Sequence, residues 1–193
     1  VVVGADKMSV VIDYTDRSTC VLFGDGAGAV MLEPTEDEMG MQDFVLHVDG
    51  AGGPHLCQPG GGSLHPASHE TVDKRMHFIR QDGREVFKFA SKAMADSAAE
   101  VLERNGLTGE DVALLVPHQA NKRIIDACAK RMKLPSDRVV INIEKYGNTT
   151  AGTIPIALSE AVEQGRVRRG DRLVFASAGG GYVWGSALLR WAY

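Results

Sequence analysis

The hydrophobic positions between residues 83 and 106 recur at steps of three and four, which predicts an amphipathic helix ending at Asn105-Gly106. The stretch NKRIIDACAKRMKL repeats this period and predicts a second helix over residues 121–134, with Cys128 on its apolar face. TIPIALSEAVEQG predicts a third helix over residues 153–165. Pro155 lies in its first turn and Gly165 at its end, where these residue types are favoured.

Short apolar runs before and between these helices predict buried strands. The stretch TCVLFGDGAGAVML (19–32) predicts two more strands, broken by a glycine-rich bend at Gly24, Gly26 and Gly28. After residue 85 helices and strands alternate, which predicts an α/β fold with a mixed sheet and helices on its faces. The runs are VVVGAD (1–6), FVLHVD (44–49), VALLV (112–116), RVVINI (138–143), DRLVFASA (171–178) and SALLRWAY (186–193).

Residues 50–70 carry many Gly, Pro, Ser and His residues without a hydrophobic period, so they are predicted to form a loop. Four histidines lie in or beside this segment, at spacings of 8, 10 and 4 that match no standard metal-ligand pattern. A solvated surface loop is therefore favoured over a metal site. These histidines are His47, His55, His65 and His69.

Composition narrows the class of protein. The 193 residues carry a formal net charge of -4, which argues against a nucleic-acid-binding protein, since such proteins need a basic surface. No apolar run approaches the roughly 18 residues of a membrane span, and the first residues lack the layout of a signal peptide. Three widely spaced cysteines, Cys20, Cys57 and Cys128, indicate reduced thiols in a cytoplasmic protein.

Three segments at the carboxyl ends of predicted strands contain groups that can act on a carbonyl. His118 follows VALLV, Asn148 follows RVVINI, and Gly179–Gly181 follow DRLVFASA. Imidazole and amide N–H groups can stabilise an enolate, and glycine backbone N–H groups can stabilise an oxyanion. Each residue alone could equally satisfy local backbone groups, so the spacing leaves a carbonyl site and a structural role both open.

A larger pattern carries a family resemblance. The stretches VPHQANKRIID, KYGNTTAGTIPIALSEAV and GGGYVWGSALLRW occur in order after DRSTCVLFGDGAGAVMLEP and RQDGREVFKFA. Together they resemble β-ketoacyl-acyl-carrier-protein synthase III, a thiolase-fold enzyme of bacterial fatty-acid synthesis. The resemblance implies a Claisen condensation, in which a cysteine takes an acyl group from acyl-CoA and malonyl on the carrier protein loses CO₂.

The resemblance also implies roles for individual residues. His118 and Asn148 would hold the malonyl thioester carbonyl, and the backbone N–H of Gly180 would belong to the oxyanion hole. Asn121 and Arg123 would line the entrance, and Gly83 and Arg84 would edge the CoA tunnel. Arg123 could also be a solvated helix charge. The nearby Lys122, Lys130, Arg131 and Lys133 could attract an acidic carrier protein, although a solvated helix face is favoured.

Two departures from the family pattern stand out. The nucleophilic cysteine of the family begins a buried helix in the amino-terminal half, and none of the three cysteines here has that context. The family usually carries an aromatic residue before the glycine run, where this chain has Ala178, and Tyr182 could partly fill that space.

The resemblance and the apolar run at residue 1 lead to a prediction about domain organisation. We expect a polypeptide truncated upstream, with residues 1–34 the end of an amino-terminal thiolase-like half and residues 35–193 the carboxyl-terminal half. The partners would be acyl-CoA, malonyl-acyl-carrier-protein, the missing amino-terminal half and a second subunit of a homodimer. We expect no cofactor, metal, nucleic acid or membrane, and an isolated chain that is inactive.

Three alternatives remain open at this point. One is another thiolase-fold Claisen enzyme, such as a type III polyketide synthase. Another is a non-catalytic half that binds CoA or carrier protein without performing a condensation. The third is an unrelated α/β binding domain, which predicts no affinity for CoA.

Overall fold

The computed structural model describes residues 1–193 and contains eight strands and five α-helices. The strands are β1 (Val2–Asp6), β2 (Gly26–Val30), β3 (Gly40–Val48), β4 (Leu56–Cys57), β5 (Arg80–Gln81), β6 (Leu114–Pro117), β7 (Arg172–Gly179) and β8 (Val183–Arg190). The helices are α1 (His69–Asp73), α2 (Gly83–Arg104), α3 (Lys122–Arg131), α4 (Ile143–Tyr146) and α5 (Thr153–Glu163).

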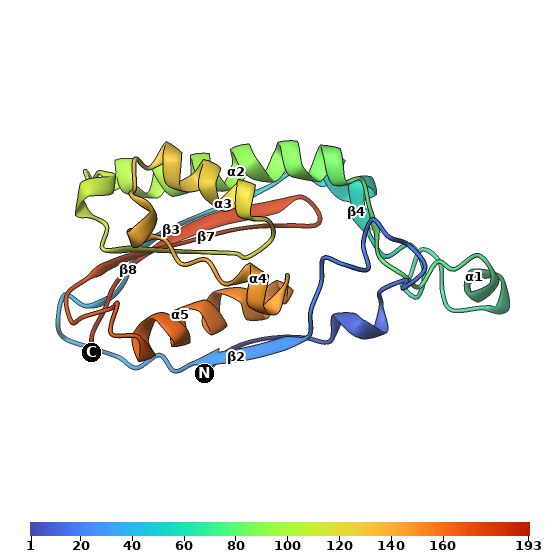
Figure 1. Ribbon diagram of the computed structural model, residues 1–193, viewed down its shortest axis with the longest axis horizontal. Helices are drawn as coiled ribbons and strands as arrows, with labels where there is room; N and C mark the ends of the chain where they lie inside the picture. The colour runs from blue at the N-terminus through green and yellow to red at the C-terminus, as the bar shows by residue number, and fades with distance from the viewer.

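The central sheet has four strands in the order β3-β8-β7-β6, with β6 parallel to β7 and the other pairs antiparallel. Helices α2 and α3 cover one face of this sheet and α5 lies on the other (Figure 1). Beyond α5, β1 and β2 form a separate antiparallel ribbon. The predicted α/β class with a mixed sheet is therefore confirmed. The predicted boundary near residue 34 falls between β2 and β3 and stays a prediction.

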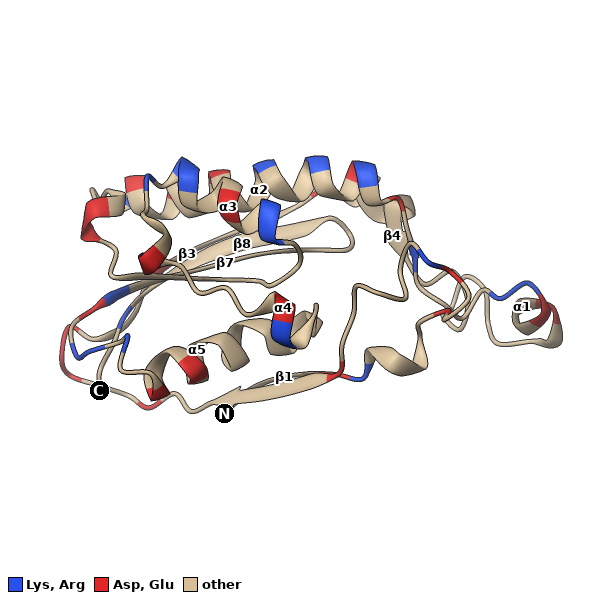
Figure 2. Ribbon diagram, in the orientation of Figure 1, with Lys and Arg blue, Asp and Glu red and all other residues tan.

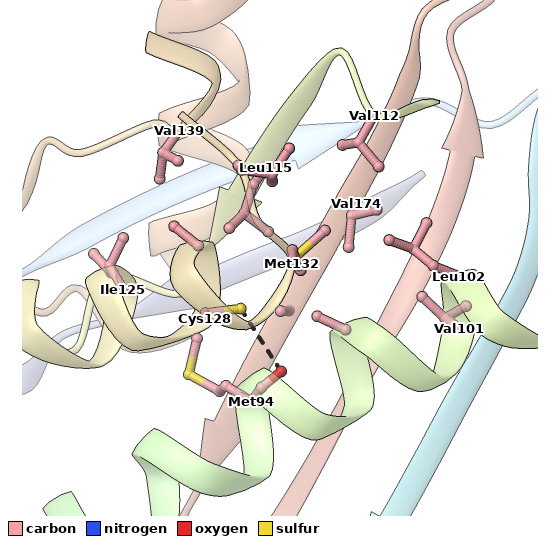
Figure 3. Packing of buried hydrophobic residues seen from close by; sticks show 14 of the residues in the cluster. Met94, Val101, Leu102, Val112, Leu115, Ile125, Cys128, Met132, Val139 and Val174 are labelled. Atoms are coloured by element: carbon pink, nitrogen blue, oxygen red, sulfur yellow. Dashed lines mark hydrogen bonds between the residues drawn. The ribbon is translucent and has the colours of Figure 1, made fainter. Parts of the chain in front are cut away.

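Two apolar clusters hold these layers together. The larger one joins α2, α3 and the sheet, and it includes the fully buried Met94, Leu115 and Ile125 (Figure 3). The smaller one joins the other face of the sheet to α5, through residues such as Leu114, Leu173 and Ala157. Burial of apolar surface is the main stabilising contribution in folding, so these two clusters hold α3 and α5 against the sheet.

Capping residues set the starts of two helices near the future site. The Asp82 carboxylate accepts hydrogen bonds from the backbone N–H groups of Arg84 and Glu85, so α2 begins at Gly83. The Asn121 side chain accepts from the Arg123 N–H, so α3 begins at Lys122. All three predicted helices are present, and their ends lie within three residues of the predicted ones.

The predicted strand over residues 138–143 is wrong. Only Val139 forms an isolated bridge to Leu115, and the chain then enters α4. The buried Gln119 side chain replaces the missing ladder: its Nε2 donates to the Val140 carbonyl at 3.1 Å, and its Oε1 accepts from the Asn142 N–H at 3.0 Å. A side chain therefore satisfies the backbone groups that a neighbouring strand would have used.

The prediction of two strands over residues 19–32 is half correct. Residues 15–22 form turns, in which the Asp16 carboxylate accepts from the Ser18 N–H, so Cys20 lies in a turn and not in a strand. The glycines do not mark a bend between strands. A Cβ at Gly26 would lie 2.8 Å from Thr149, and one at Gly28 would lie 2.7 Å from Pro155. The missing side chains let β2 lie directly against the start of α5.

The segment over residues 50–70 is more ordered than its composition predicts. A short 3-10 helix spans Gly50–His55, and β4 pairs with β5. Cys57 therefore lies in a strand and not in a flexible loop. Ser68 caps α1 through a capping box with Thr71, and this single turn projects away from the body of the molecule (Figure 1).

Lys or Arg positions and Asp or Glu positions both occur along α2 and α3 (Figure 2). Lys122 pairs with Asp126 at 2.8 Å, and Arg131 lies 3.5 Å from Asp96. These contacts favour the interpretation of this surface as a solvated helix face with balanced charge. None of the helices is both long and apolar enough to span a lipid bilayer.

Candidate active site

Several separate parts of the chain surround one cavity of about 330 Å³. They are residues 22–23, β4 and β5, one side of α2, the end of β6 with the start of α3, the turn before α5, and the hairpin between β7 and β8. His118, Asn148 and Gly180, the residues predicted to handle a carbonyl, all line this cavity. Residues that are distant in sequence are therefore brought together at the carboxyl ends of β6 and β7.

His118 continues the line of β6, with its backbone N–H donating to the Ala176 carbonyl at 2.8 Å. Its ring is buried, and burial lowers the pKa of His118 to about 4 because the charged form is poorly solvated. The imidazole is therefore neutral at pH 7. Its Nδ1 lies 2.7 Å from the hydroxyl of Thr153, the first residue of α5.

Asn148 is fixed from two sides. Its backbone N–H donates to the Leu22 carbonyl at 2.9 Å, and its own carbonyl accepts from the Gly24 N–H at 3.0 Å. Its side-chain Oδ1 accepts from the backbone N–H of Thr150 at 2.9 Å. Because Thr150 donates and Oδ1 accepts, the amide nitrogen Nδ2 is the end of the side chain that remains to donate to a bound molecule.

Thr150 joins this turn to the first strand. Its φ of 49° lies in the left-handed region, which is uncommon for a β-branched residue. Asp6, at the end of β1, accepts a short hydrogen bond from the Thr150 hydroxyl and a second one, at 3.1 Å, from the Ala151 N–H. The Asp6 carboxylate thus holds the turn that carries Asn148.

The β7–β8 hairpin presents a free backbone donor to the cavity. The N–H of Gly180 makes no hydrogen bond within the chain. A Cβ at this position would lie 3.0 Å from the Leu56 carbonyl oxygen, so the close approach of β4 favours glycine here. An unpaired N–H beside a cavity is the group that an oxyanion hole needs.

Aromatic rings form one wall of the cavity. Tyr182 stacks on Phe89 with ring centroids 3.8 Å apart and planes inclined by 7°. The Tyr182 hydroxyl is buried without a hydrogen-bond partner, and burial raises the pKa of this group. Ala178 also lines the cavity, so the small residue and the stacked pair share the space where the family pattern has an aromatic side chain.

The four residues predicted to bind CoA or carrier protein divide into two pairs. Asn121 and Gly83 line the cavity, whereas Arg84 and Arg123 are exposed and lie outside its lining. The Arg123 guanidinium lies 4.6 Å from the centroid of the Phe87 ring, and Phe87 is itself part of the lining. This contact places the exposed Arg123 charge beside the cavity, and its role in binding stays a prediction.

None of the three cysteines lines the cavity. Cys128 is fully buried in the larger apolar cluster, where its thiol points to the Met94 carbonyl at 3.7 Å (Figure 3). Burial raises the pKa of Cys128 to about 12, so the reactive thiolate is scarce at neutral pH. No group of three or more His, Cys, Asp or Glu side chains is arranged to hold a metal ion.

Sequence reasoning missed three residues that position the donors: Asp6, Thr150 and Thr153. Their contacts join positions 144 and 35 residues apart, which no local pattern reveals. The threonines lie inside the quoted stretch KYGNTTAGTIPIALSEAV, but their side chains carry no distinctive chemistry until the turn is folded.

Comparison with known proteins identifies the family. The sequence profile described as "3-Oxoacyl-[acyl-carrier-protein (ACP)] synthase III C terminal" matches residues 102–191, and the profile "3-Oxoacyl-[acyl-carrier-protein (ACP)] synthase III" matches residues 1–50. The chain belongs to the 3-oxoacyl-[acyl-carrier-protein] synthase III family. The resemblance noted in the sequence is confirmed, and so is the thiolase-like fold that it implied.

Individual members of the synthase III family are similar along nearly the whole chain. A β-ketoacyl-[acyl-carrier-protein] synthase III of Koribacter versatilis is 56% identical over 194 residues, covering 100% of this chain and 58% of the relative. That of Chlorobaculum tepidum is 58% identical and covers 98% and 58%. The crystal structure of the Aquifex aeolicus enzyme superposes with a TM-score of 0.86 at 44% identity, covering 98% of this chain and 56% of that one. The chain thus spans under two thirds of the length of these relatives.

Proposed function

We propose that this chain supplies the carbonyl-binding part of a decarboxylative Claisen condensation site, in which acyl-CoA condenses with malonyl-acyl-carrier-protein. The observation that carries the proposal is the convergence of His118, Asn148 and Gly180 on one cavity from three separate segments. The names of the relatives, β-ketoacyl-[acyl-carrier-protein] synthases III, support a β-ketoacyl product on an acyl carrier protein, and the family resemblance implies acyl-CoA and a malonyl group as the substrates.

In the first step, the thioester carbonyl oxygen of the malonyl group accepts hydrogen bonds from His118 and Asn148. The bond between the α-carbon and the carboxylate breaks, CO₂ leaves, and the electron pair forms an enolate. Negative charge develops on the carbonyl oxygen, so two N–H donors already in place stabilise the transition state more than the substrate. A neutral His118 donates without giving up its proton.

In the second step, the enolate carbon attacks the carbonyl carbon of the acyl thioester. The carbonyl oxygen becomes an oxyanion that accepts a hydrogen bond from the Gly180 N–H, and collapse of this intermediate expels a thiolate. On this proposal the acyl group is carried by a thiol other than Cys20, Cys57 or Cys128. The absence of all three from the cavity lining supports that assignment.

The same proposal assigns the cavity edge to the phosphopantetheine arm and CoA. Asn121 and Gly83 lie along the lining, and Arg84 and Arg123 provide positive charge beside it for phosphate groups. A homodimer is part of the proposal.

The decisive experiment measures CO₂ release from malonyl-acyl-carrier-protein in the longest natural protein that contains this chain. His118→Ala and Asn148→Ala should each lower this rate about 100-fold or more, because each removes a donor to the enolate. Acyl transfer from radioactive acetyl-CoA should remain within about threefold in both variants.

His47→Ala is the matched control, since His47 lies outside the cavity and contacts Glu100 and Trp184. CO₂ release at the wild-type rate in both site variants contradicts the proposal. Acetyl label on Cys20, Cys57 or Cys128 overturns the assignment of the thiol. CoA binding without any CO₂ release by the wild-type protein favours a non-catalytic binding protein instead.

A further inference from the structure

Two side-chain donors line the cavity, those of His118 and Asn148. The neutral imidazole of His118 carries only one ring proton. His118 can donate to a bound carbonyl only if that proton is on the nitrogen facing the cavity, Nε2, which leaves Nδ1 as an acceptor. A buried acceptor without a partner costs free energy, so the group next to Nδ1 decides which tautomer is stable. In this chain the group next to Nδ1 is the Thr153 hydroxyl.

We propose that Thr153 is a positioning residue whose hydroxyl donates to Nδ1 of His118 and thereby keeps the Nε2 proton directed to the cavity. The inference rests on the proposed function, because that function is what requires a donor at Nε2 of His118. Thr153 itself does not line the cavity and is 2% exposed, so it acts through His118.

The alternative arrangement has the Thr153 hydroxyl donating to the Thr150 carbonyl, 2.9 Å away, while accepting from an Nδ1 proton. That carbonyl already accepts the backbone N–H of Thr153, so it does not need the hydroxyl. No other donor in the chain reaches Nδ1.

The distances favour the same assignment. The 2.7 Å contact of the Thr153 hydroxyl to Nδ1 is shorter than its 2.9 Å contact to the Thr150 carbonyl. On the proposal, the hydroxyl proton lies on the shorter of these two lines, from Thr153 to His118.

The turn between Asn148 and Thr153 thus sets both donors at once. The Thr150 N–H occupies the oxygen of the Asn148 amide, which leaves its NH₂ group for the cavity. The Thr153 hydroxyl occupies the lone pair of His118, which leaves its N–H for the cavity. In each case a threonine next to the site occupies the acceptor end of the side chain and frees the donor end.

The test uses magic-angle-spinning NMR of the longest natural protein, labelled with histidine that carries ¹⁵N only at Nδ1. The His118 signal is assigned by its loss in His118→Asn. In the wild-type protein at pH 7 we expect the shift of an unprotonated ring nitrogen. A protonated Nδ1 overturns the proposal, and this measurement requires no variant at Thr153.

Two substitutions extend the test. Thr153→Ser keeps the hydroxyl and should keep the unprotonated shift, with CO₂ release within about threefold of wild type. Thr153→Val has the same shape without the hydroxyl, so Nδ1 should become protonated in a large fraction of molecules, and CO₂ release should fall about tenfold or more. An unchanged Nδ1 shift in Thr153→Val reduces Thr153 to a packing role and overturns the inference.

Ser97→Ala is the matched control, because it removes a buried hydroxyl that bonds Ser186 in the core, away from the cavity. It should leave the Nδ1 shift unchanged. Failure of this inference and failure of the proposed function are separable. The NMR shift decides the first, and CO₂ release by the wild-type protein decides the second.

Discussion

At the scale of single residues, the same effect of burial has opposite consequences for the possible functions of His118 and Cys128. Both lie away from water, and in each case the neutral form is favoured. His118 borders a cavity, where a neutral ring with a directed N–H is a useful donor. Cys128 is enclosed by the apolar cluster, where a neutral thiol has no access to a substrate. Burial alone therefore does not identify a functional residue.

Gly180→Ala is predicted to slow the condensation step about tenfold or more. The new methyl group would meet the Leu56 carbonyl oxygen at 3.0 Å, and we expect the hairpin to shift by a few tenths of an ångström, which moves its free N–H away from the oxyanion. The measurement is the rate of β-ketoacyl product formation. Gly179→Ala is the control, because nothing lies within 4 Å of a Cβ at that position. Equal rates for the two variants would exclude a role for the Gly180 N–H.

At the scale of elements, the turn before α5 is held by contacts from outside its own segment. Asp6 of β1 holds Thr150 in the left-handed region, and residues 22–24 hold the backbone of Asn148. Glu160 of α5 accepts hydrogen bonds from Asn142 and Tyr146, which fixes α4 just before the turn and lowers the pKa of this carboxyl to about 2. The orientation of the Asn148 amide is therefore a property of several elements together.

Asp6→Ala is predicted to lower CO₂ release about tenfold, because the Thr150 turn loses both bonds that hold it and the Asn148 amide loses its fixed direction. The readout is kcat for decarboxylation together with thermal stability.

The matched control is Asp25→Ala. Asp25 accepts hydrogen bonds from the Ser9 N–H and hydroxyl, each at 2.7 Å, and does not line the cavity. We expect Asp25→Ala to lose about as much thermal stability as Asp6→Ala, while its rate of decarboxylation stays at the wild-type value. A normal rate in Asp6→Ala would show that the turn keeps its geometry without the carboxylate.

At the scale of the whole molecule, the buried neutral His118 connects the site to global stability. Its pKa is about 4 in the folded state, against 6.5 for an unperturbed histidine. Between these values the unfolded chain binds a proton that the folded chain does not bind. The free energy of unfolding therefore falls as the pH falls from 6.5 towards 4, by up to about 3 kcal/mol from this residue.

His118→Asn is predicted to weaken this pH dependence of stability. The measurement is the free energy of unfolding by urea at several pH values between 7 and 4, compared with the wild-type protein. His65→Asn serves as the control, because His65 is exposed and its removal should leave the pH dependence unchanged. A variant curve parallel to the wild-type curve would contradict the low pKa of His118.

Hydrophobic periodicity was sufficient for the three long helices and for the central strands, since each buries one continuous apolar face. The convergence of His118, Asn148 and Gly180 also followed from the family resemblance. Positions after strands indicated it correctly for His118 and Gly180 only, since Asn148 follows α4. The prediction of a strand over residues 138–143 was wrong because the side chain of Gln119, a polar residue that is only 1% exposed, makes the hydrogen bonds that a neighbouring strand would have made. Asp6 and Thr153 could not be found because their roles exist only in tertiary contacts.

The bond between Asp6 and Thr150 closes a loop of 144 residues, so it belongs to the most non-local contacts of the molecule. Contacts of this kind are entropically expensive to form early in folding. We therefore expect the central sheet and its helices to assemble first, and the alignment of the Asn148 amide to be completed only when the β1–β2 ribbon docks. Any ligand that requires the aligned amide would in turn slow the detachment of that ribbon. Hydrogen exchange of β1 would then report occupancy of a cavity that β1 does not itself line.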